Sequence, residues 1–348
     1  MPKRVIIGMS GGVDSSAAII KLQEMGLEVV GVTFKFIDDF DVDDAVKVAK
    51  HLGIEHYIED YRNEFREEVI DKFLNDYKNG LTPNPCVHCN RYCKFRYLFL
   101  CMEKYNCDYV ATGHYANIHD GKIYKSVDLD KDQSYFLYDL PKDKINSIIF
   151  PLEGLTKDEV REIAKNAGLI NYNKKDSFDV CFIKTSFRDY ISNNIKQKSG
   201  DVIDIQTGEK IGKHKGLAYY TIGQRRGLDI GGTKDRMFVV GKDIEKNILY
   251  IALGDDNDYL ISDACIIEDV NLLTDENITK CKAKFRYRMN DVDVELEYLD
   301  NNRILVKYPE GVKRVTLGQA CVLYKDDQCL GGGIIKEIRK NNKKLWYL

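Results

Sequence analysis

The stretch that most constrains this chain lies at its beginning, where a short apolar run ends in a double glycine. Residues 4–9 include two isoleucines and a valine, and small residues follow Gly11 and Gly12. This pattern predicts a β-strand, a tight turn and the start of an α-helix. Glycines let a backbone approach an anion closely, and the free N–H groups of a helix start attract negative charge. The hydroxyls of Ser10 and Ser15 are further hydrogen-bond donors, so the stretch indicates a phosphate-binding loop. Asp14 is a candidate ligand for a metal ion in this loop.

Strand and helix patterns alternate between residues 28 and 112. Strands are expected over residues 28–34, 55–58 and 109–112, and helices around residues 65–77 and 94–105. Such alternation predicts an α/β fold with a doubly wound parallel sheet, in which ligands bind at the carboxyl ends of strands. Residues 8–15, Phe34 and residues 112–114 all follow such ends, so we expect them to converge on one nucleotide.

Length and composition indicate a globular protein of several domains. The chain has 348 residues, 44% hydrophobic and 31% charged. No apolar run approaches the roughly 20 residues of a membrane span. Because Met-Pro-Lys-Arg comes directly before the first strand, we expect no signal peptide and a cytoplasmic location. The pattern becomes β-rich after residue 200, which predicts an α/β domain over 1–200, a small β-rich domain over 201–258 and a β-barrel-like domain over 259–348.

Charge is unevenly distributed, although the net charge is only −3. Residues 38–76 hold 13 acidic and 5 basic residues, whereas residues 184–236 hold 11 basic and 6 acidic residues. A local basic surface suits a nucleic acid, and the alternative is an ordinary solvated face. Within the basic region, residues 219–228 are expected to form a strand that exposes Arg225 and Arg226.

The cysteines point to reactive chemistry. Ten cysteines in a cytosolic chain indicate metal, redox or sulfur-transfer chemistry rather than a disulfide framework. Cys86 and Cys89 form a C-x-x-C pair, and Pro83 and Pro85 are expected to hold this pair on an extended turn. Such a pair can bind zinc or a cluster, undergo redox chemistry or act as a nucleophile. Cys181 begins a later apolar run. It can take part in chemistry with Cys89 only if the fold brings the two residues close together.

Several stretches together carry a family resemblance. The loop Ser10-Gly-Gly-Val-Asp-Ser15 resembles the S-G-G-x-D-S loop of the PP-loop ATP pyrophosphatases, and it matches neither G-x-x-x-x-G-K-[ST] nor G-x-G-x-x-G. The other stretches are residues 82–90, 111–115, 131–136, 181–183, 216–228 and 330–333. In this order, and over nearly the whole chain, they resemble the tRNA-specific 2-thiouridylases.

The resemblance implies roles for individual positions. Residues 84–86 and 131–133 match stretches that surround the target base and the anticodon, and Phe34 stands where the family commonly has methionine. The implied ATP-binding residues are Gly8, Met9, Ser10, Gly11, Gly12, Val13, Asp14, Ser15, Phe34 and Gly113. The implied tRNA contacts are Asn84, Pro85, Cys86, His114, Lys131, Asp132, Gln133, Arg286, Tyr287 and Gln319.

The family replaces oxygen by sulfur at position 2 of the wobble uridine of tRNA. The resemblance implies a sulfurtransferase that adenylates the base oxygen with ATP and Mg²⁺ and releases pyrophosphate. Cys181 matches the cysteine that carries a persulfide, and Cys89 matches the nucleophile that forms a disulfide with it. Thiolates are needed because only deprotonated sulfur attacks well. The implied partners are tRNA and a sulfur donor protein, either a cysteine desulfurase or a sulfur relay protein, and no membrane.

The sequence also leaves rival functions and a rival mechanism open. A PP-loop enzyme of this kind can act on another tRNA position or another substrate, and a non-catalytic RNA-binding module would use its cysteines for structural zinc. Many relatives carry aspartate at position 86, so Cys86 adds a third thiol, and Cys86, Cys89 and Cys181 are candidate ligands of a four-iron four-sulfur cluster. We favour the persulfide route because it needs only Cys89 and Cys181.

Overall fold

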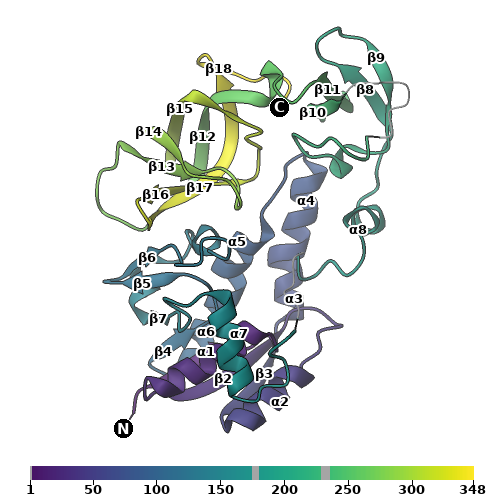
Figure 1. Cartoon of the computed structure of the whole chain (residues 1–348). Coiled ribbons are helices and arrows are strands. Elements are labelled where there is room, and N and C mark those ends of the chain that lie inside the picture. The colour runs from purple at the N-terminus through teal and green to yellow at the C-terminus, as the bar shows by residue number, and fades with distance from the viewer. Residues whose placement is uncertain (1, 175–179, 229–235) are drawn as a thin grey trace.

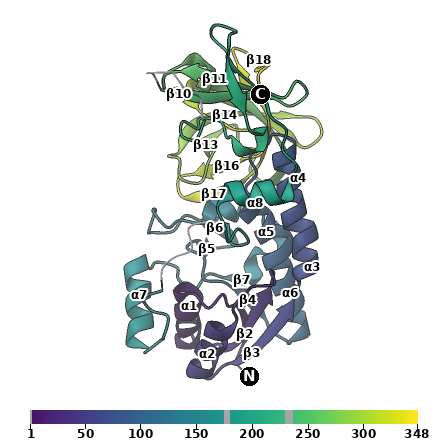
Figure 2. The ribbon, with the colours of Figure 1, turned by 90° about the vertical axis from the view of Figure 1, so that its right-hand side faces the viewer.

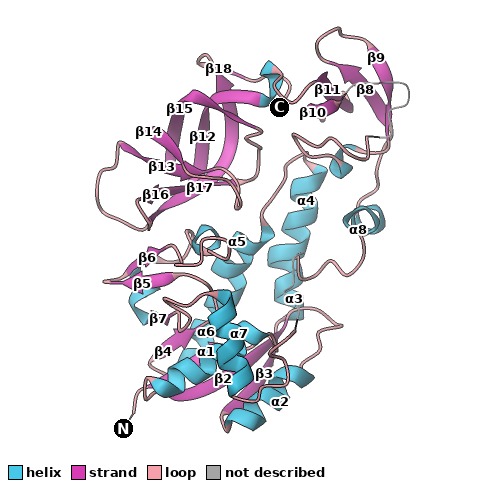
Figure 3. Ribbon diagram, viewed as in Figure 1, coloured by secondary structure: helices cyan, strands magenta, loops and turns pink. Residues whose placement is uncertain are grey.

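The computed structural model describes residues 2–174, 180–228 and 236–348, which form an α/β unit and a β-rich part above it (Figure 1; Figure 3). The α/β unit is built on a five-stranded parallel sheet with the strand order β3-β2-β1-β4-β7. Its strands are β1 (Arg4–Gly8), β2 (Glu28–Lys35), β3 (Glu55–Asp60), β4 (Tyr109–Ala111) and β7 (Ile148–Ile149). This sheet confirms the α/β fold that the sequence predicts.

Alternating side chains in β1 explain why helices cover both faces of the sheet. Val5 and Ile7 are buried in one core, and Ile6 is buried in another on the opposite face. The helices on the Val5 side are α1 (Val13–Glu24), α2 (Asp43–Leu52) and α7 (Lys157–Asn166). The helical runs on the Ile6 side are α3 (Arg62–Phe65), η1 (Arg66–Asp71) and α4 (Lys72–Lys78), then α5 (Pro85–Cys89), η2 (Asn90–Lys94) and α6 (Phe95–Lys104). Figure 2 shows α1, α2 and α7 on one side of the sheet and α3 and α6 on the other.

The prolines before Cys86 lead into a helix. Pro85 occupies the first position of α5, where its fixed φ and missing N–H suit a helix start. The side chain of Asn84 accepts a hydrogen bond of 3.2 Å from the Cys86 backbone N–H and caps the helix. The prediction of an extended turn is therefore wrong, and Cys86 and Cys89 lie in the first turn of a helical run that continues to Lys104.

A hairpin joins the α/β unit to the C-terminal sheet. Its strands are β5 (Asn117–His119) and β6 (Lys122–Tyr124). In β6, Tyr124 pairs with Gln328, and the Lys125 backbone N–H donates to the Asp327 carbonyl at 2.8 Å. The largely buried Lys125 ammonium also forms an ion pair with Asp291 at 2.5 Å. Three short helices lie elsewhere between the strands: η3 (Ser134–Phe136), η4 (Lys142–Ser147) and α8 (Phe187–Asn194).

The central part is a small sheet with the order β10-β11-β8-β9. Its elements are β8 (Gly200–Asp204), β9 (Lys210–His214), η5 (Leu217–Tyr219), β10 (Met237–Asp243) and β11 (Ile248–Leu253). The strand predicted over residues 219–228 is absent from this described segment, because Gly223 and Gly227 have φ values of +83° and +73° and turn the backbone. Arg225 and Arg226 are exposed, as predicted.

The C-terminal part closes into a barrel. The strand β12 pairs with both β15 and β17, so six antiparallel strands form a ring around one apolar core. Its elements are η6 (Asp258–Leu260), β12 (Ile261–Leu272), β13 (Lys280–Lys284), β14 (Val292–Leu299), β15 (Arg303–Lys313), β16 (Ala320–Lys325), β17 (Gln328–Lys340) and the short β18 (Lys343–Lys344). A Cβ atom at Gly331 would lie 2.1 Å from the Asn271 carbonyl oxygen, so glycine is required where β17 crosses β12.

Within the described ranges, the helices are all too short or too polar to span a lipid bilayer.

Candidate active site

The loop after β1 is braced by its own serines. Ser10 Oγ accepts from the Gly12 backbone N–H at 3.3 Å, and Ser15 Oγ donates to the Gly12 carbonyl at 3.2 Å. Gly12 caps α1, and Gly11 has a φ of +69° that favours glycine. The loop therefore presents the start of α1 without a bulky side chain over it, which is the geometry of an anion-binding helix terminus.

The segment after β4 packs directly on this loop. A Cβ atom at Gly113 would lie 2.8 Å from the Asp14 carbonyl carbon and 2.8 Å from the Ser15 nitrogen. The structure thus brings Gly113 to the phosphate loop, as the sequence predicts. Phe34 lies at the end of the neighbouring strand β2, but its ring is only 7% exposed and packs among Phe36, Tyr61 and other aromatic side chains.

Two cations that the sequence motifs do not reveal lie beside the loop. Lys157 Nζ donates to Asp14 Oδ1 at 2.6 Å, and the Tyr115 hydroxyl donates to the same oxygen at 2.7 Å. Lys174 Nζ lies 3.4 Å from the Gly11 carbonyl oxygen. Both ammonium groups already pair with a carboxylate, so a triphosphate at the loop would share their positive charge. The sequence marks Lys157 only as the first residue of a capped helix.

Asn171 fixes the loop from a distant segment. Its amide nitrogen donates to the Gly11 carbonyl at 3.1 Å and to Ser16 Oγ at 2.9 Å, and the side chain is buried. Because these bonds join positions far apart in the chain, no local sequence pattern indicates them.

The fold returns Cys181 to the helix that carries Cys86 and Cys89. Phe182, the residue after Cys181, packs against Phe73 of α4 with 5.2 Å between ring centroids. Burial raises the pKa of both other thiols, and a negative charge on Cys181 raises both further. Cys86 and Cys181 reach solvent, and Cys89 is partly buried. Protein atoms nevertheless crowd all three side chains, and this desolvation raises the pKa of each thiol above its usual value. The ten cysteines, all in described parts of the chain, are free thiols in this structure.

The positive charge of Lys94 counteracts the effect of desolvation on the pKa of the thiols. It lies at the end of η2, and its positive charge lowers the pKa of Cys86, Cys89 and Cys181. Its ammonium lies 3.4 Å from His114 Nε2. Burial, and then the charge of Lys94, lower the pKa of His114 well below its usual value, so the imidazole is neutral at neutral pH.

The residues implied as tRNA contacts fall into two groups. One group lies at the junction of α5 with the barrel: Gln319 Nε2 donates to the Thr82 carbonyl at 2.6 Å, and Tyr287 lies 4.3 Å from Phe136 between ring centroids. Burial and the charge of Asp132 raise the pKa of Tyr287, and a negative charge on Cys86 makes a smaller contribution in the same direction.

The other group is engaged within the protein. The buried Asp132 carboxylate accepts hydrogen bonds from Ser126 and Ser134, and Gln133 Oε1 accepts from the Tyr115 N–H at 3.0 Å. Lys131 is half-buried. Arg286 donates to the Ile222 carbonyl at 3.1 Å and to Thr316 Oγ1. These side chains hold loops in place. If Asp132 or Arg286 contacts RNA, it must do so with groups that also form these internal hydrogen bonds.

The three thiols are not arranged as a ligand set for a cluster. In the segments that the structure describes, His, Cys, Asp and Glu side chains nowhere form a group of three able to hold a metal ion. A cluster bound by Cys86, Cys89 and Cys181 therefore does not fit this arrangement, and we derive no step through one.

Similarity to known proteins extends over the whole chain. Three family models match in succession: a tRNA methyl transferase HUP domain over residues 3–185, a tRNA methyl transferase PRC-barrel domain over 188–253 and an aminomethyltransferase β-barrel domain over 262–335. The tRNA-specific 2-thiouridylase MnmA of Staphylococcus carnosus is 43% identical, covering 99% of this chain and 98% of its own. The enzyme of the same name from Mycoplasmopsis pulmonis is 41% identical, covering 99% of both chains.

Among solved structures, a 4-thiouridine synthetase in complex with RNA and ATP is 19% identical over 51% of this chain and 44% of that chain, with a TM-score of 0.35. The full-length relatives, more than 40% identical and matched from end to end, decide the assignment. The chain belongs to the family of tRNA-specific 2-thiouridylases.

Proposed function

We propose that this protein uses ATP to convert the wobble uridine of tRNA to 2-thiouridine. The observation that carries the proposal is the return of Cys181 to the helix of Cys89, with the charge of Lys94 acting on both thiols and a phosphate loop in the same α/β unit. Activation of an oxygen by ATP and delivery of sulfur from a cysteine need both of these sites.

ATP occupies the loop formed by residues 8–15, with Gly113 and Phe34 beside it. Lys157 and Lys174 add positive charge close to Asp14 and Gly11, where the phosphates bind. Mg²⁺ is commonly held by one or two carboxylates together with substrate phosphates. Asp14 supplies one such carboxylate here, and the bound ion would screen the charge of the phosphates.

The reaction balances in two stages. The uridine O2 attacks the α-phosphorus of ATP, and pyrophosphate leaves. The terminal sulfur of a Cys181 persulfide attacks C2, the Cys89 thiolate attacks the inner sulfur of Cys181, and the S–S bond of the persulfide breaks. AMP leaves with the former O2, a Cys89–Cys181 disulfide forms, and a cellular thiol reduces it before the next cycle.

The parts of the chain outside the phosphate loop serve RNA binding and sulfur delivery in this proposal. The tRNA contacts are those implied by the family resemblance, from Asn84 to Gln319, and a sulfur donor protein loads Cys181, which reaches solvent. The division into residues 1–200, 201–258 and 259–348 belongs to the same proposal. The three successive family models support a division into three parts, although their first junction lies between residues 185 and 188.

The direct test is nucleoside analysis of tRNA incubated with the purified protein, ATP, Mg²⁺ and a persulfide donor. We expect 2-thiouridine with the wild type and none with Cys181→Ala or Cys89→Ala, whereas Cys107→Ala, at a thiol away from the site, keeps the activity. Unmodified uridine after incubation with a persulfide-loaded wild type would refute the proposal. Loss of 2-thiouridine from cells that lack the gene would support it in vivo.

A further inference from the structure

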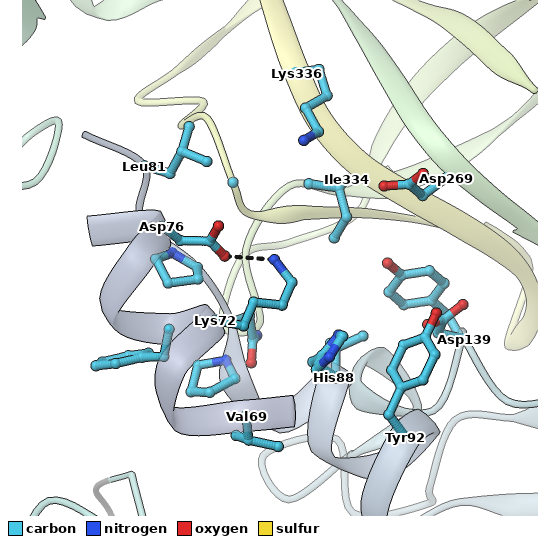
Figure 4. Close-up of a pocket in the computed structure, with 17 residues that line it drawn as sticks. Val69, Lys72, Asp76, Leu81, His88, Tyr92, Asp139, Asp269, Ile334 and Lys336 are labelled. Carbon is cyan, nitrogen blue, oxygen red and sulfur yellow. Dashed lines mark hydrogen bonds and ion pairs between the residues drawn. The ribbon is translucent and has the colours of Figure 1, made fainter. Parts of the chain in front are cut away.

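A cavity of about 200 Å³ lies behind the helix that carries the cysteines (Figure 4). It is enclosed by α4, α5 and the barrel strand β17. Val87 and His88 of α5 line it, together with Asn84 and Pro85 at the start of this helix. The cavity thus shares a helix with Cys86 and Cys89, which are not among its lining residues.

The walls of the cavity are aromatic and charged. The rings of His88 and Tyr92 lie 4.3 Å apart between centroids. Figure 4 shows Asp139 and Asp269 near Tyr92, and a Lys72–Asp76 ion pair of 2.8 Å across the cavity from them. Lys336 projects from β17 above this pair. A ring with polar edges, attached to a phosphate, would match these walls.

Two polar groups in the wall are left without partners by the protein. Tyr138 is 1% exposed, and although its backbone carbonyl accepts from Asn271, its hydroxyl has no hydrogen-bond partner within the described residues. The Asp139 carboxylate likewise makes no hydrogen bond or ion pair there, and burial, with Asp269 nearby, raises its pKa to about 6 although Arg91 acts in the opposite direction. Asp139 is only partly buried, so water can reach its carboxylate in the free protein. Both groups line the cavity and are available to form hydrogen bonds with a ligand there.

We propose that this cavity binds one unstacked base of the RNA substrate, a direct neighbour of the uridine that is modified. This proposal rests on the proposed function. Enzymes that act on a base take it out of the stack, and its neighbours then lose a stacking partner. The ring of Tyr92 or His88 replaces that partner, Asp139 and Asp269 accept hydrogen bonds from N–H groups on the base edge, and the Tyr138 hydroxyl bonds to the same edge.

Size and position favour a base of the RNA over a free metabolite. The volume lies below the roughly 300–1,000 Å³ of sites for drug-sized ligands, so it suits one ring system. The cavity sits where the α/β unit meets the barrel, and Asn84 and Pro85 line it at the start of the helix that presents the reacting thiols. Lys336 provides positive charge for a phosphate of the same strand, whereas the charge of Lys72 is already shared with Asp76.

The test uses an anticodon stem–loop RNA with a wobble uridine, and two versions in which the nucleotide directly 5′ or 3′ of this uridine is abasic. Dissociation constants are measured for the wild type, Tyr138→Phe and the double variant Asp139→Asn with Asp269→Asn. Asp293→Asn, at an exposed position on β14 outside the cavity, is the matched control. Thermal unfolding verifies that each variant is folded.

We expect Tyr138→Phe to weaken binding of the intact RNA by about three- to tenfold, the effect of one lost hydrogen bond. With one of the two abasic RNAs, wild type and Tyr138→Phe should bind equally weakly, and the aspartate double variant should behave in the same way. The proposal is overturned if the variants bind intact RNA like the wild type, or if they weaken the binding of all three RNAs by the same factor. Formation of 2-thiouridine by the wild type in the same samples separates failure of this proposal from failure of the proposed function.

Discussion

The phosphate loop and the sulfur site are built in opposite ways. The loop is local: bonds between Ser10, Gly12 and Ser15 brace it, and its anion-binding groups are backbone N–H groups at a helix start. The sulfur site joins α5 to Cys181, a residue that follows the whole α/β sheet in the chain. The first site therefore depends on backbone geometry, whereas the second depends on the crowding and charge of side chains.

This difference affects the chemistry of each site. The backbone N–H groups of a glycine loop bind a phosphate without gaining or losing a proton. The thiols must be deprotonated to react, and their surroundings raise their pKa. Lys94 compensates for part of that effect. Substitutions at the loop should thus abolish adenylation and leave the reactivity of the thiols unchanged. Substitutions at Lys94 should lower the reactivity of the thiols and leave adenylation unchanged.

The largest effect is expected for Gly113→Val. The added side chain would meet the backbone of Asp14 and Ser15 at 2.8 Å, and it would displace the start of α1. We expect pyrophosphate release to slow by about 100-fold, as for other misplacements of about 1 Å in active sites. Alkylation of Cys89 and Cys181 by iodoacetamide should be unchanged.

The control for this variant is Gly212→Ala in β9, where an added Cβ atom meets nothing within 4 Å. It should release pyrophosphate at the wild-type rate. Normal release by a folded Gly113→Val protein would contradict the assignment of the loop.

Lys94→Met is expected to act on the sulfur site alone. Loss of the cation raises the pKa of Cys89 and Cys181, so less thiolate is present at a given pH, and the pH profile of alkylation moves upward. A shift of about one pH unit, or a rate about tenfold lower at pH 8, is expected. Peptide-resolved mass spectrometry after iodoacetamide treatment measures it.

Lys94→Arg provides the matched control, because it keeps the charge and should leave the profile close to that of the wild type. An unshifted profile for Lys94→Met would mean that another group sets the reactivity of the thiols. ATP binding is expected to be the same in both variants.

The exposed pair Arg225 and Arg226 tests a surface outside both sites. Replacing both by glutamate should weaken tRNA binding and lower the salt dependence of the dissociation constant by about one unit of slope for each lost phosphate contact. ATP binding should not change. A salt slope equal to that of the wild type would show that these arginines do not contact the tRNA backbone.

The smallest effect is expected for Asn84→Ala, which removes the cap of α5. The free energy of unfolding should fall by about 1 kcal/mol, and Tm by about 2–4 °C, in the protein without RNA. Asn84→Asp keeps a capping oxygen and should retain the stability. Equal Tm values for the alanine variant and the wild type would show that the cap does not stabilise the helix.

Sequence patterns predict the local features of this molecule. The strand, glycine turn and helix of the loop and the capped start of α7 follow from them, because each depends on neighbours in the chain. The parallel sheet follows from the alternation of strands and helices. The sequence also predicts that Gly113 lies near the nucleotide, because it follows a strand end and matches the family. Its close contact with Asp14 and Ser15 explains why glycine stands there.

The features that differ from prediction have physical causes. Proline disrupts the interior of a helix, yet Pro85 at the first position of α5 costs no hydrogen bond. Residues 219–228 carry strand-forming side chains, but the positive φ values of Gly223 and Gly227 interrupt any ladder. Lys94 and Asn171 act through contacts with segments far along the chain, for which no spacing rule exists.

The pairing of β6 with β17 has a practical consequence for anyone who shortens this protein. A fragment that ends before the barrel would leave an open sheet edge at β6 and would strip Lys125 of its carboxylate partner on Asp291. Open edges recruit other chains, and an unpaired buried cation destabilises its surroundings. The ATP-binding half is therefore best produced with its C-terminal barrel attached, and engineering that exchanges barrels between relatives must carry the β5–β6 hairpin along with them.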